Sequence, residues 1–257
     1  MKEKKEIIST VEEKELNAPN GLAVGILSVL VYIAAAVGVI PAAMALDNGN
    51  TAFGTVLMTI CVLWLCVGWI PFMGVKVIRP NEALVLTLFG KYTGTLKKEG
   101  IFFVNPFSIA VNPASAQKIA SGKNPQEATA PVGKKLSLKA MTLDNKKQKI
   151  NDRDGNPIEI SIVVIWKIAN TAKAVFNVDN YEEYVSIQSD SALRDVAGAY
   201  PYDGDGENVK SLRGSSAEIA GHLRDMLQSR VDDAGIEVIE ARITHLAYAP
   251  EIAAAML

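Results

Sequence analysis

Two long apolar runs near the N-terminus constrain this chain more than any other feature. They cover Gly21 to Leu46 and Thr51 to Val75, and neither contains Asp, Glu, Lys, Arg or His. At about 1.5 Å of rise per residue, each run forms a helix of roughly 37 to 39 Å, longer than the roughly 30 Å hydrocarbon core of a bilayer. The sequence therefore predicts two membrane spans, which the short connector, residues 47–50, forces to lie antiparallel.

Positive charges flank this hairpin at its two ends but are absent from its connector. The flanking cations are Lys2, Lys4, Lys5, Lys14, Lys76 and Arg79. By the positive-inside rule, both termini are expected in the cytoplasm and the chain in the cell membrane. A polar stretch of about twenty residues precedes the first run, which argues against a cleaved signal peptide. A loop that enters and leaves the membrane on one face is the alternative.

Composition narrows the classes of partner. The chain has 257 residues, a formal net charge of −2 and a pI near 5.8, so no nucleic-acid partner is expected. Roughly 180 residues follow Val75, enough for one sizeable core or two small subdomains. Cys61 and Cys66 both lie in the second run on different helix faces, which indicates apolar filling rather than a disulfide or a metal pair.

The first part after the spans has strand patterning. From Glu82 to Lys91, the leucines at 84, 86 and 88 alternate with Val85, Thr87 and Phe89, which predicts a strand. A second apolar cluster, residues 101–104, ends at Asn105-Pro106-Phe107. Residues 112–135, rich in Pro, Ala, Ser, Gly and Lys, are then expected to form a long surface loop.

A β-hairpin is predicted next, with strands over 136–150 and 158–169. The core face of its second strand is expected to carry Ile158, Ile160, Ile162, Val164, Trp166 and Ile168. The Asp154-Gly155 pair suits the tight turn, and Pro157 excludes a calcium-loop interpretation of the same segment.

Helical patterns follow this hairpin. Thr171 is expected to cap a short helix through Phe176, and Asp179 with Glu182 to open a helix that ends near Ala199. Another helix is predicted over 215–234 with Gly235 as its C-terminal cap, then a strand over 236–247 and a new helix start over 251–257. This order predicts an α+β fold.

Catalytic motifs are absent from the sequence. It contains no nucleophile elbow, phosphate-binding loop, dinucleotide glycine pattern or zinc-protease motif. The two histidines, His222 and His245, and the acidic stretch 203–207 are typical of ordinary surface or core positions. We therefore expect no enzymatic activity, no metal and no cofactor.

Several segments together resemble the SPFH domain, the band 7 family of stomatins, prohibitins, flotillins and bacterial relatives. The resemblance is carried by Arg79-Pro80-Asn81-Glu82-Ala83-Leu84-Val85, Phe89-Gly90-Lys91-Tyr92, Glu99-Gly100-x-Phe102-Phe103-x-Asn105-Pro106-Phe107, Asn151-Asp152-x-x-Gly155-Asn156-Pro157, Tyr181-Glu182-Glu183-Tyr184-Val185 and the stretch Glu237 to Ile252. It covers residues 74–257 in order, in the form of the two-span bacterial members.

The apolar runs and the charges around them predict a cytoplasmic segment over 1–20 and a transmembrane hairpin over 21–75. The resemblance adds an SPFH domain over 76–250 and the start of a C-terminal helix over 251–257. The domain would comprise an antiparallel β-rich subdomain and a helical, mixed subdomain. The resemblance also implies a non-catalytic scaffold on the lipid bilayer. Its copies would form large homo-oligomeric rings or cages around a membrane microdomain, with partners such as membrane-anchored ATP-dependent proteases.

Two departures from the family pattern stand out. Residues 112–135 look like an insertion, and the long helix that usually follows the domain is cut short at Leu257, so we expect either a C-terminally truncated fragment or other closing contacts. Contact with the membrane surface is expected at Ile101, Phe102, Phe103, Phe107, Lys118 and Lys123. An ordinary core is the alternative for the four apolar residues, and a solvated loop for the two lysines.

Two other functions compete with the scaffold. A membrane-tethered hydrolase or regulatory subunit would use Asp203, Asp205, Glu207 and a histidine. A transporter or channel subunit would line a pore only as an oligomer, and neither span carries the ionisable residue that substrate pathways usually contain.

Overall fold

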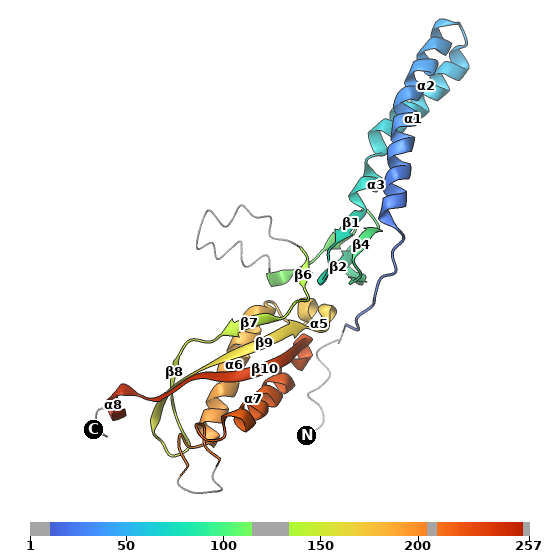
Figure 1. The fold of residues 1–257 in the computed structure, drawn as a ribbon. Helices are drawn as coiled ribbons and strands as arrows, with labels where there is room; N and C mark the ends of the chain where they lie inside the picture. The colour runs from blue at the N-terminus through green and yellow to red at the C-terminus, as the bar shows by residue number, and fades with distance from the viewer. Residues whose placement is uncertain (1–10, 115–133, 205–209, 254–257) are drawn as a thin grey trace. The chain divides into compact units, whose positions relative to one another are not determined.

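The computed structural model describes residues 11–114, 134–204 and 210–253. The chain divides into two compact units (Figure 1). The anchor unit comprises Lys14–Val111, and the helix–sheet unit comprises residues 1–13 and 112–257. Together they give the α+β fold that the sequence predicts.

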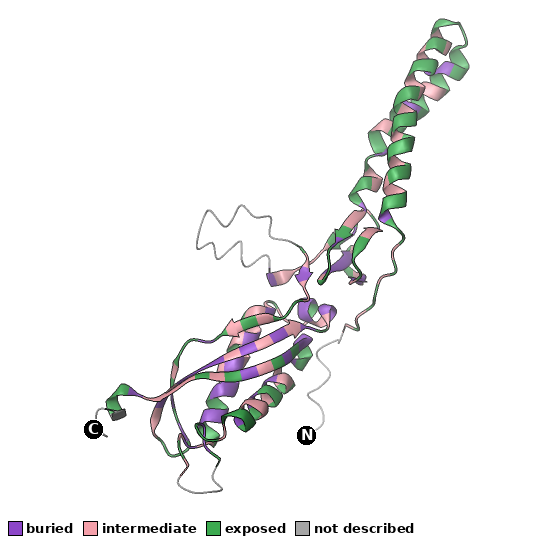
Figure 2. Ribbon diagram, viewed as in Figure 1, coloured by how far each residue is buried: buried purple, intermediate pink, exposed green. Residues whose placement is uncertain are grey.

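The anchor unit begins with two apolar helices, α1 (Gly21–Asp47) and α2 (Thr51–Val67). Both are long and apolar enough to cross a membrane, and most of their surface outside the contact between them is exposed and carries large apolar residues (Figure 2). In water such a surface would be strongly unfavourable, whereas in a bilayer it faces lipid. The helices pack closely where Gly38 meets the Cys61 sulfur, and the Tyr32 hydroxyl donates to the Leu65 carbonyl at 3.3 Å.

The second apolar run is not one continuous helix through Val75, as the sequence suggested. The helix α2 ends at Val67, a separate short helix α3 (Ile70–Met73) follows, and Val75 already belongs to a strand. Pro71 is the cause, because a proline has no N–H and its ring clashes with the carbonyl four residues earlier, that of Val67.

Five strands complete the anchor unit. They are β1 (Val75–Ile78), β2 (Glu82–Leu88), β3 (Lys91–Leu96), β4 (Gly100–Phe103) and β5 (Ile109–Ala110). The strand β1 pairs with β4, and β2 pairs with both β3 and β5, all antiparallel. A core cluster forms from Ile78, Leu84, Leu86, Leu96 and Val104. Both faces of β2 are buried, so its alternating sequence does not divide into a dry and a wet face.

The polar segment before α1 is built into these strands. Leu16 N donates to Thr95 O at 3.0 Å, and Thr95 N donates to Lys14 O at 2.8 Å. Leu16 and Ala18 also pack against the core cluster. The chain is therefore hydrogen-bonded to the β-part on its way into the first span.

The helix–sheet unit is organised around one long strand, β9 (Pro157–Ile168). It pairs antiparallel with β10 (Ile236–Tyr248) on one side, and with β7 (Met141–Asp144) and β8 (Gln148–Asn151) on the other. The predicted core face of this strand is confirmed, since all six of its residues are at most 3% exposed.

The partner strand predicted over 136–150 is interrupted. It divides into β6 (Leu136–Ser137), β7 and β8. Between β7 and β8 the Asn145 backbone N–H donates to Ile162 O at 3.0 Å, while its side-chain amide donates to the Asp190 carboxylate at 2.7 Å. At the break, Asn145 therefore keeps a backbone bond to β9 while its side chain is held by α6.

Helices cover one face of this sheet (Figure 1). They are α5 (Thr171–Phe176), α6 (Tyr181–Ala199), α7 (Ser216–Val231) and the single 3-10 turn η1 (Asp232–Ala234), and a short α8 (Pro250–Ala253) follows β10. The Tyr181 ring packs edge-on against Trp166 with ring centroids 6.1 Å apart, and burial raises the pKa of Tyr181 to about 12.

Two predicted helix caps are displaced by one residue. Asn170, not Thr171, caps α5 by accepting from Lys173 N at 2.9 Å. Asn180, not Asp179, caps α6 by accepting from the N–H groups of Glu182 and Glu183. Asn and Asp cap helices about equally well, so which residue caps depends on where the preceding strand or loop ends.

The turn between β8 and β9 is held by the Asp152 carboxylate. Its oxygens accept backbone N–H bonds from Asn156 at 2.7 Å, Asp154 at 3.0 Å and Tyr202 at 3.0 Å. Burial alone would raise the pKa of Asp152, but these bonds to the ionised form outweigh burial and lower it. Gly155 in the same turn has φ +87°, as the Asp154-Gly155 signal predicted.

Candidate functional site

An exposed apolar rim lies at one end of the β-part of the anchor unit. We define the rim as Phe89, Phe107 and Ile109, which are 87%, 62% and 59% exposed. Phe107 and Ile109 follow one another across a tight turn in which Ser108 N donates to Asn105 O. In β5, Ile109 pairs with Thr87 of β2, so Phe89, two residues further along, projects from the same end of the strand pair.

Hydrogen bonds place the end of β4, which shortly precedes Phe107 of the rim, beside the two points where the spans join the domain. Phe103 N donates to Pro19 O just before α1, and Val104 N donates to Gly74 O just after α3. Phe107 follows Val104 by three positions, a reach of at most about 10 Å. The backbone of Phe102 also approaches Gly21, the first residue of α1, so closely that a Cβ there would lie 2.5 Å from it.

The structure separates the apolar residues that the sequence grouped together. Ile101, Phe102 and Phe103 lie in β4 and are half-buried, and Phe102 packs against the core cluster. Phe107 alone of the four is exposed. Lys118 and Lys123 lie outside the described residues.

Sequence reasoning missed two of the three rim residues. Phe89 was assigned to the alternation of a strand, but it lies beyond β2 with φ +49°, a conformation that bulky residues rarely adopt. The Gly90 that follows it was the available signal, because glycine marks a turn where the strand must already have ended. Ile109 belongs to a strand of two residues, too short for any periodicity.

Residues proposed for a hydrolytic site have ordinary polar partners. Asp203 pairs with Arg213 at 3.2 Å, and the Tyr200 hydroxyl lies 3.2 Å from Nδ1 of His222. His245 lies in β10, whereas Asp205 and Glu207 lie outside the described residues. Within residues 11–114, 134–204 and 210–253, no group of three or more His, Cys, Asp or Glu side chains could hold a metal ion.

Two known proteins show what this chain is similar to. Stomatin of Mus musculus is 21% identical over 182 residues, which cover 70% of this chain and 51% of stomatin. An uncharacterized protein of Methanothermobacter thermautotrophicus is 23% identical over 201 residues, which cover 78% of this chain and 53% of that protein. The chain spans about half the length of these curated relatives.

A family model supplies the assignment. The model described as "SPFH domain / Band 7 family" matches residues 76–257, which include β2 to β5 of the anchor unit and the described helix–sheet unit from Leu136 onward. The matched segment begins directly after the two apolar helices. The chain belongs to the SPFH domain / Band 7 family.

Proposed function

We propose that this protein is a membrane-anchored scaffold. Its copies would assemble into large homo-oligomeric rings or cages that enclose a membrane microdomain and organise membrane proteins, among them membrane-anchored ATP-dependent proteases. The observation that carries the proposal is the direct attachment of an SPFH domain to a hairpin whose outer surface is apolar and exposed. Scaffolding rather than catalysis also agrees with the ordinary partners of Asp203 and His222.

Contact of the domain with the membrane surface is part of this proposal. Phe107 of the rim lies within about 10 Å of Val104, which bonds Gly74 at the exit of the spans. Trp69 and Phe72, at that exit, are themselves 54% and 38% exposed. Aromatic side chains favour the boundary between headgroups and acyl chains, where an apolar ring and a polar surrounding are both accommodated. The rim would thus hold the β-part against the bilayer, and Phe107 is the residue that this surface shares with the sequence prediction.

The charge distribution supports an orientation with the domain and both termini in the cytoplasm. Lys76 and Arg79 follow the hairpin, and its connector, residues 47–50, has no cation. A cysteine placed at Asn48, with Cys61 and Cys66 replaced by serine, would then react with a membrane-impermeant maleimide on intact cells. Reaction only after the cells are opened would reverse the assignment.

Assembly is tested on the full chain extracted in a mild detergent. Size-exclusion chromatography with light scattering should give particles far larger than a monomer, and electron microscopy should image rings. A uniform monomer or dimer, or release of the chain from membranes by alkaline carbonate, would contradict the proposal.

A further inference from the structure

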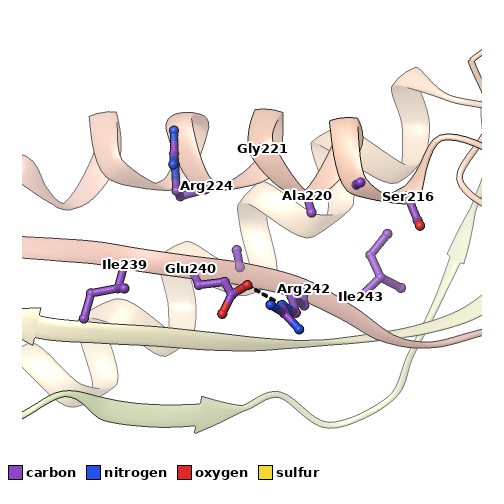
Figure 3. A pocket seen from close by; sticks show the side chains of 10 residues that line it. Ser216, Ala220, Gly221, Arg224, Ile239, Glu240, Arg242 and Ile243 are labelled. Atoms are coloured by element: carbon purple, nitrogen blue, oxygen red, sulfur yellow. Dashed lines mark hydrogen bonds and ion pairs between the residues drawn. The ribbon is translucent and has the colours of Figure 1, made fainter.

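A groove runs between α7 and β10 in the helix–sheet unit. Its volume is about 590 Å³ (Figure 3). On the helix side it is lined by the small residues Ser216, Ala217, Ala220 and Gly221, and on the strand side by residues 239–243. A Cβ built on Gly221 meets no atom within 4 Å, so this position of the helix faces open space. The groove therefore has room for a side chain from another segment.

The charged residues that line the groove already have partners. Arg242 forms an ion pair with Glu240 (Figure 3), and Arg224 pairs with Asp225 at 2.6 Å. A charged occupant would lose its water without finding an unpaired charge among the lining residues. Ile239, in contrast, is a large apolar residue of the groove wall and is 43% exposed. The groove therefore suits an uncharged segment with apolar side chains.

The outer edge of β10 is closed along its first residues only. Among the described strands, β10 is the last in the order β10-β9-β7, so no strand lies on its other side. There the Gln228 side chain takes the place of a strand: its Oε1 accepts from Val238 N at 2.7 Å, and its Nε2 donates to Ile236 O at 2.9 Å. Residues 239–243, which follow, border the groove. An edge of this kind is where an extended segment can add.

The N-terminal segment is fastened beside the start of β10. Residues 1–13 belong to the helix–sheet unit, and the Glu13 carboxylate accepts from both the backbone N–H and the hydroxyl of the fully buried Thr171. The N–H of Asn170, the preceding residue, donates to Gly235 O at 2.9 Å, and β10 begins directly after Gly235. The chain that precedes Glu13 therefore departs from a point close to the start of β10.

Uncharged, β-branched residues precede this anchor. Four of the five residues over 7–11 are β-branched and none is charged, a composition typical of a strand: Ile7-Ile8-Ser9-Thr10-Val11. The other segments outside the described residues have no such run. Residues 115–133 contain two prolines, residues 205–209 are acidic, and residues 254–257 have no β-branched side chain. The N-terminal run is thus the segment of this chain that matches the groove in chemistry.

The run also has the right distance from its anchor. An extended chain advances about 3.3 Å per residue, so Ile8 and Ile7, five and six residues before Glu13, reach about 17 and 20 Å from it. The groove residues of β10 lie four to eight residues beyond Gly235, which corresponds to about 13 to 26 Å. A segment that follows β10 away from Glu13 runs antiparallel to it and brings both isoleucines level with the groove.

We propose that residues 7–11 dock in the groove between α7 and β10 of their own copy and cover the open edge of β10. The tether through Glu13 gives the segment an effective concentration of about millimolar at this groove, which favours its own copy over another. The register of β10 is irregular between Val238 and Glu240, so few backbone bonds are added, and an isoleucine side chain beside Gly221 supplies most of the contact.

This inference goes beyond the scaffold function and does not depend on it. It concerns one copy, in which the docked segment and Gln228 together close the edge strand of the sheet. A covered edge cannot pair with strands of other chains, so copies crowded in one membrane would be kept from aggregating through β10.

Disulfide cross-linking tests the position of the segment. The full chain carries Cys61→Ser and Cys66→Ser, and Gly221→Cys is combined with either Ile7→Cys or Ile8→Cys. Neighbouring side chains of an extended segment point to opposite sides, so mild oxidation should link one of these two pairs efficiently and the other poorly. Because the link lies within one copy, the product should keep the mass of a monomer, and mass spectrometry should identify the linked peptides.

Gly198→Cys replaces Gly221→Cys in the matched control. Gly198 is an exposed glycine of α6 with no atom within 4 Å of its Cβ position, and it does not line the groove. Neither isoleucine position should link to it. Covalent dimers formed with Gly221→Cys would place the segment in the groove of another copy and overturn the proposal, as would equal linking to the two glycine positions.

Hydrogen exchange measures the protection of the edge without any cross-link. Replacing Ile7 and Ile8 together by serine should release the segment and speed the exchange of the amides over 240–246 about tenfold, which corresponds to about 1.4 kcal/mol. Lys4→Ser with Lys5→Ser is the matched control, because it changes two residues of the N-terminal segment outside the docked run, and it should leave these rates unchanged. Equal rates in the isoleucine variant and the wild type would refute the inference.

Discussion

Insertion of the rim into the membrane surface is a quantitative prediction. A Phe side chain presents roughly 200 Å², so exposures of 87% and 62% leave about 300 Å² of Phe89 and Phe107 together in contact with solvent. At about 25 cal/mol per Å², complete transfer to hydrocarbon would gain about 7 kcal/mol. If the interface covers half of this area, about 3.5 kcal/mol favours the inserted rim, which corresponds to a ratio of several hundred to one.

An environment-sensitive probe near the rim measures this equilibrium. An NBD fluorophore is attached to Ile109→Cys in the full chain, with Cys61 and Cys66 replaced by serine, and the protein is reconstituted into liposomes. We expect a blue-shifted emission that spin-labelled lipids quench. Replacing Phe89 and Phe107 together by serine should remove most of the gain, shift the emission to the red and expose the probe to aqueous iodide.

The control probe belongs to the same unit. Lys98 is exposed and lies next to the β4 end that pairs with Ile78, away from the entry of the spans. A probe at Lys98→Cys should be quenched by iodide and not by spin-labelled lipids. The reasoning is refuted if the Ile109 probe behaves like the Lys98 probe, or if the two serine substitutions leave its emission unchanged.

Two further predictions concern the stability of the helix–sheet unit. It is measured by unfolding of the detergent-solubilised chain, with the fluorescence of Trp166 as the readout after Trp64 and Trp69 are replaced by phenylalanine. Asp152→Asn should cost about 2 kcal/mol near neutral pH, because an NH₂ group then faces a backbone N–H. Since the pKa of Asp152 is lowered from 3.8, its stabilisation is complete above about pH 4 and is lost at lower pH, so the difference from wild type should shrink there. Gly235→Ala should cost at least about 2 kcal/mol, because φ is +67° and the new Cβ would lie 2.4 Å from the Asn170 carbonyl.

Internal controls accompany both stability predictions. Gly155→Ala has φ +87° but open space around its Cβ position, so it should lose only about 1 kcal/mol from backbone strain. An equal loss at the two glycines would show that the close approach to Asn170 does not matter. A difference between wild type and Asp152→Asn that persists unchanged at pH 3 would contradict the role assigned to the carboxylate.

Long periodic segments were predictable from the sequence because burial alone determines them. The six-residue core face of β9, the apolar length of α1 and the glycine that ends η1 all follow from local rules. Pro71 was the signal that the second apolar run is interrupted. The uniformly apolar composition of that run favoured one continuous helix instead. The cap positions at Asn170 and Asn180 depended on the exact end of the preceding segment, which propensity does not specify.

The surfaces were harder to predict than the core. Phe102 and Phe107 are the same residue type five positions apart, and only the pairing of β4 with β1 decides that one packs on the core while the other is exposed. The groove beside Gly221 also escaped notice, because the small residues of α7 form a groove only once β10 lies beside them. Both features arise from contacts between segments distant in sequence.

The hydrogen bonds that fasten Leu16 to Thr95, Pro19 to Phe103 and Gly74 to Val104 have a mechanical consequence. They leave no flexible hinge between the apolar helices and the first strands, so the two parts move as one rigid unit. The helix α1 has 27 residues and is about 40 Å long, so it must tilt to fit the hydrocarbon core of a bilayer, which is about 30 Å thick. A thicker bilayer would make α1 more upright, and the attached strands would rotate through the same angle, so the thickness of the membrane would set the tilt of the β-part.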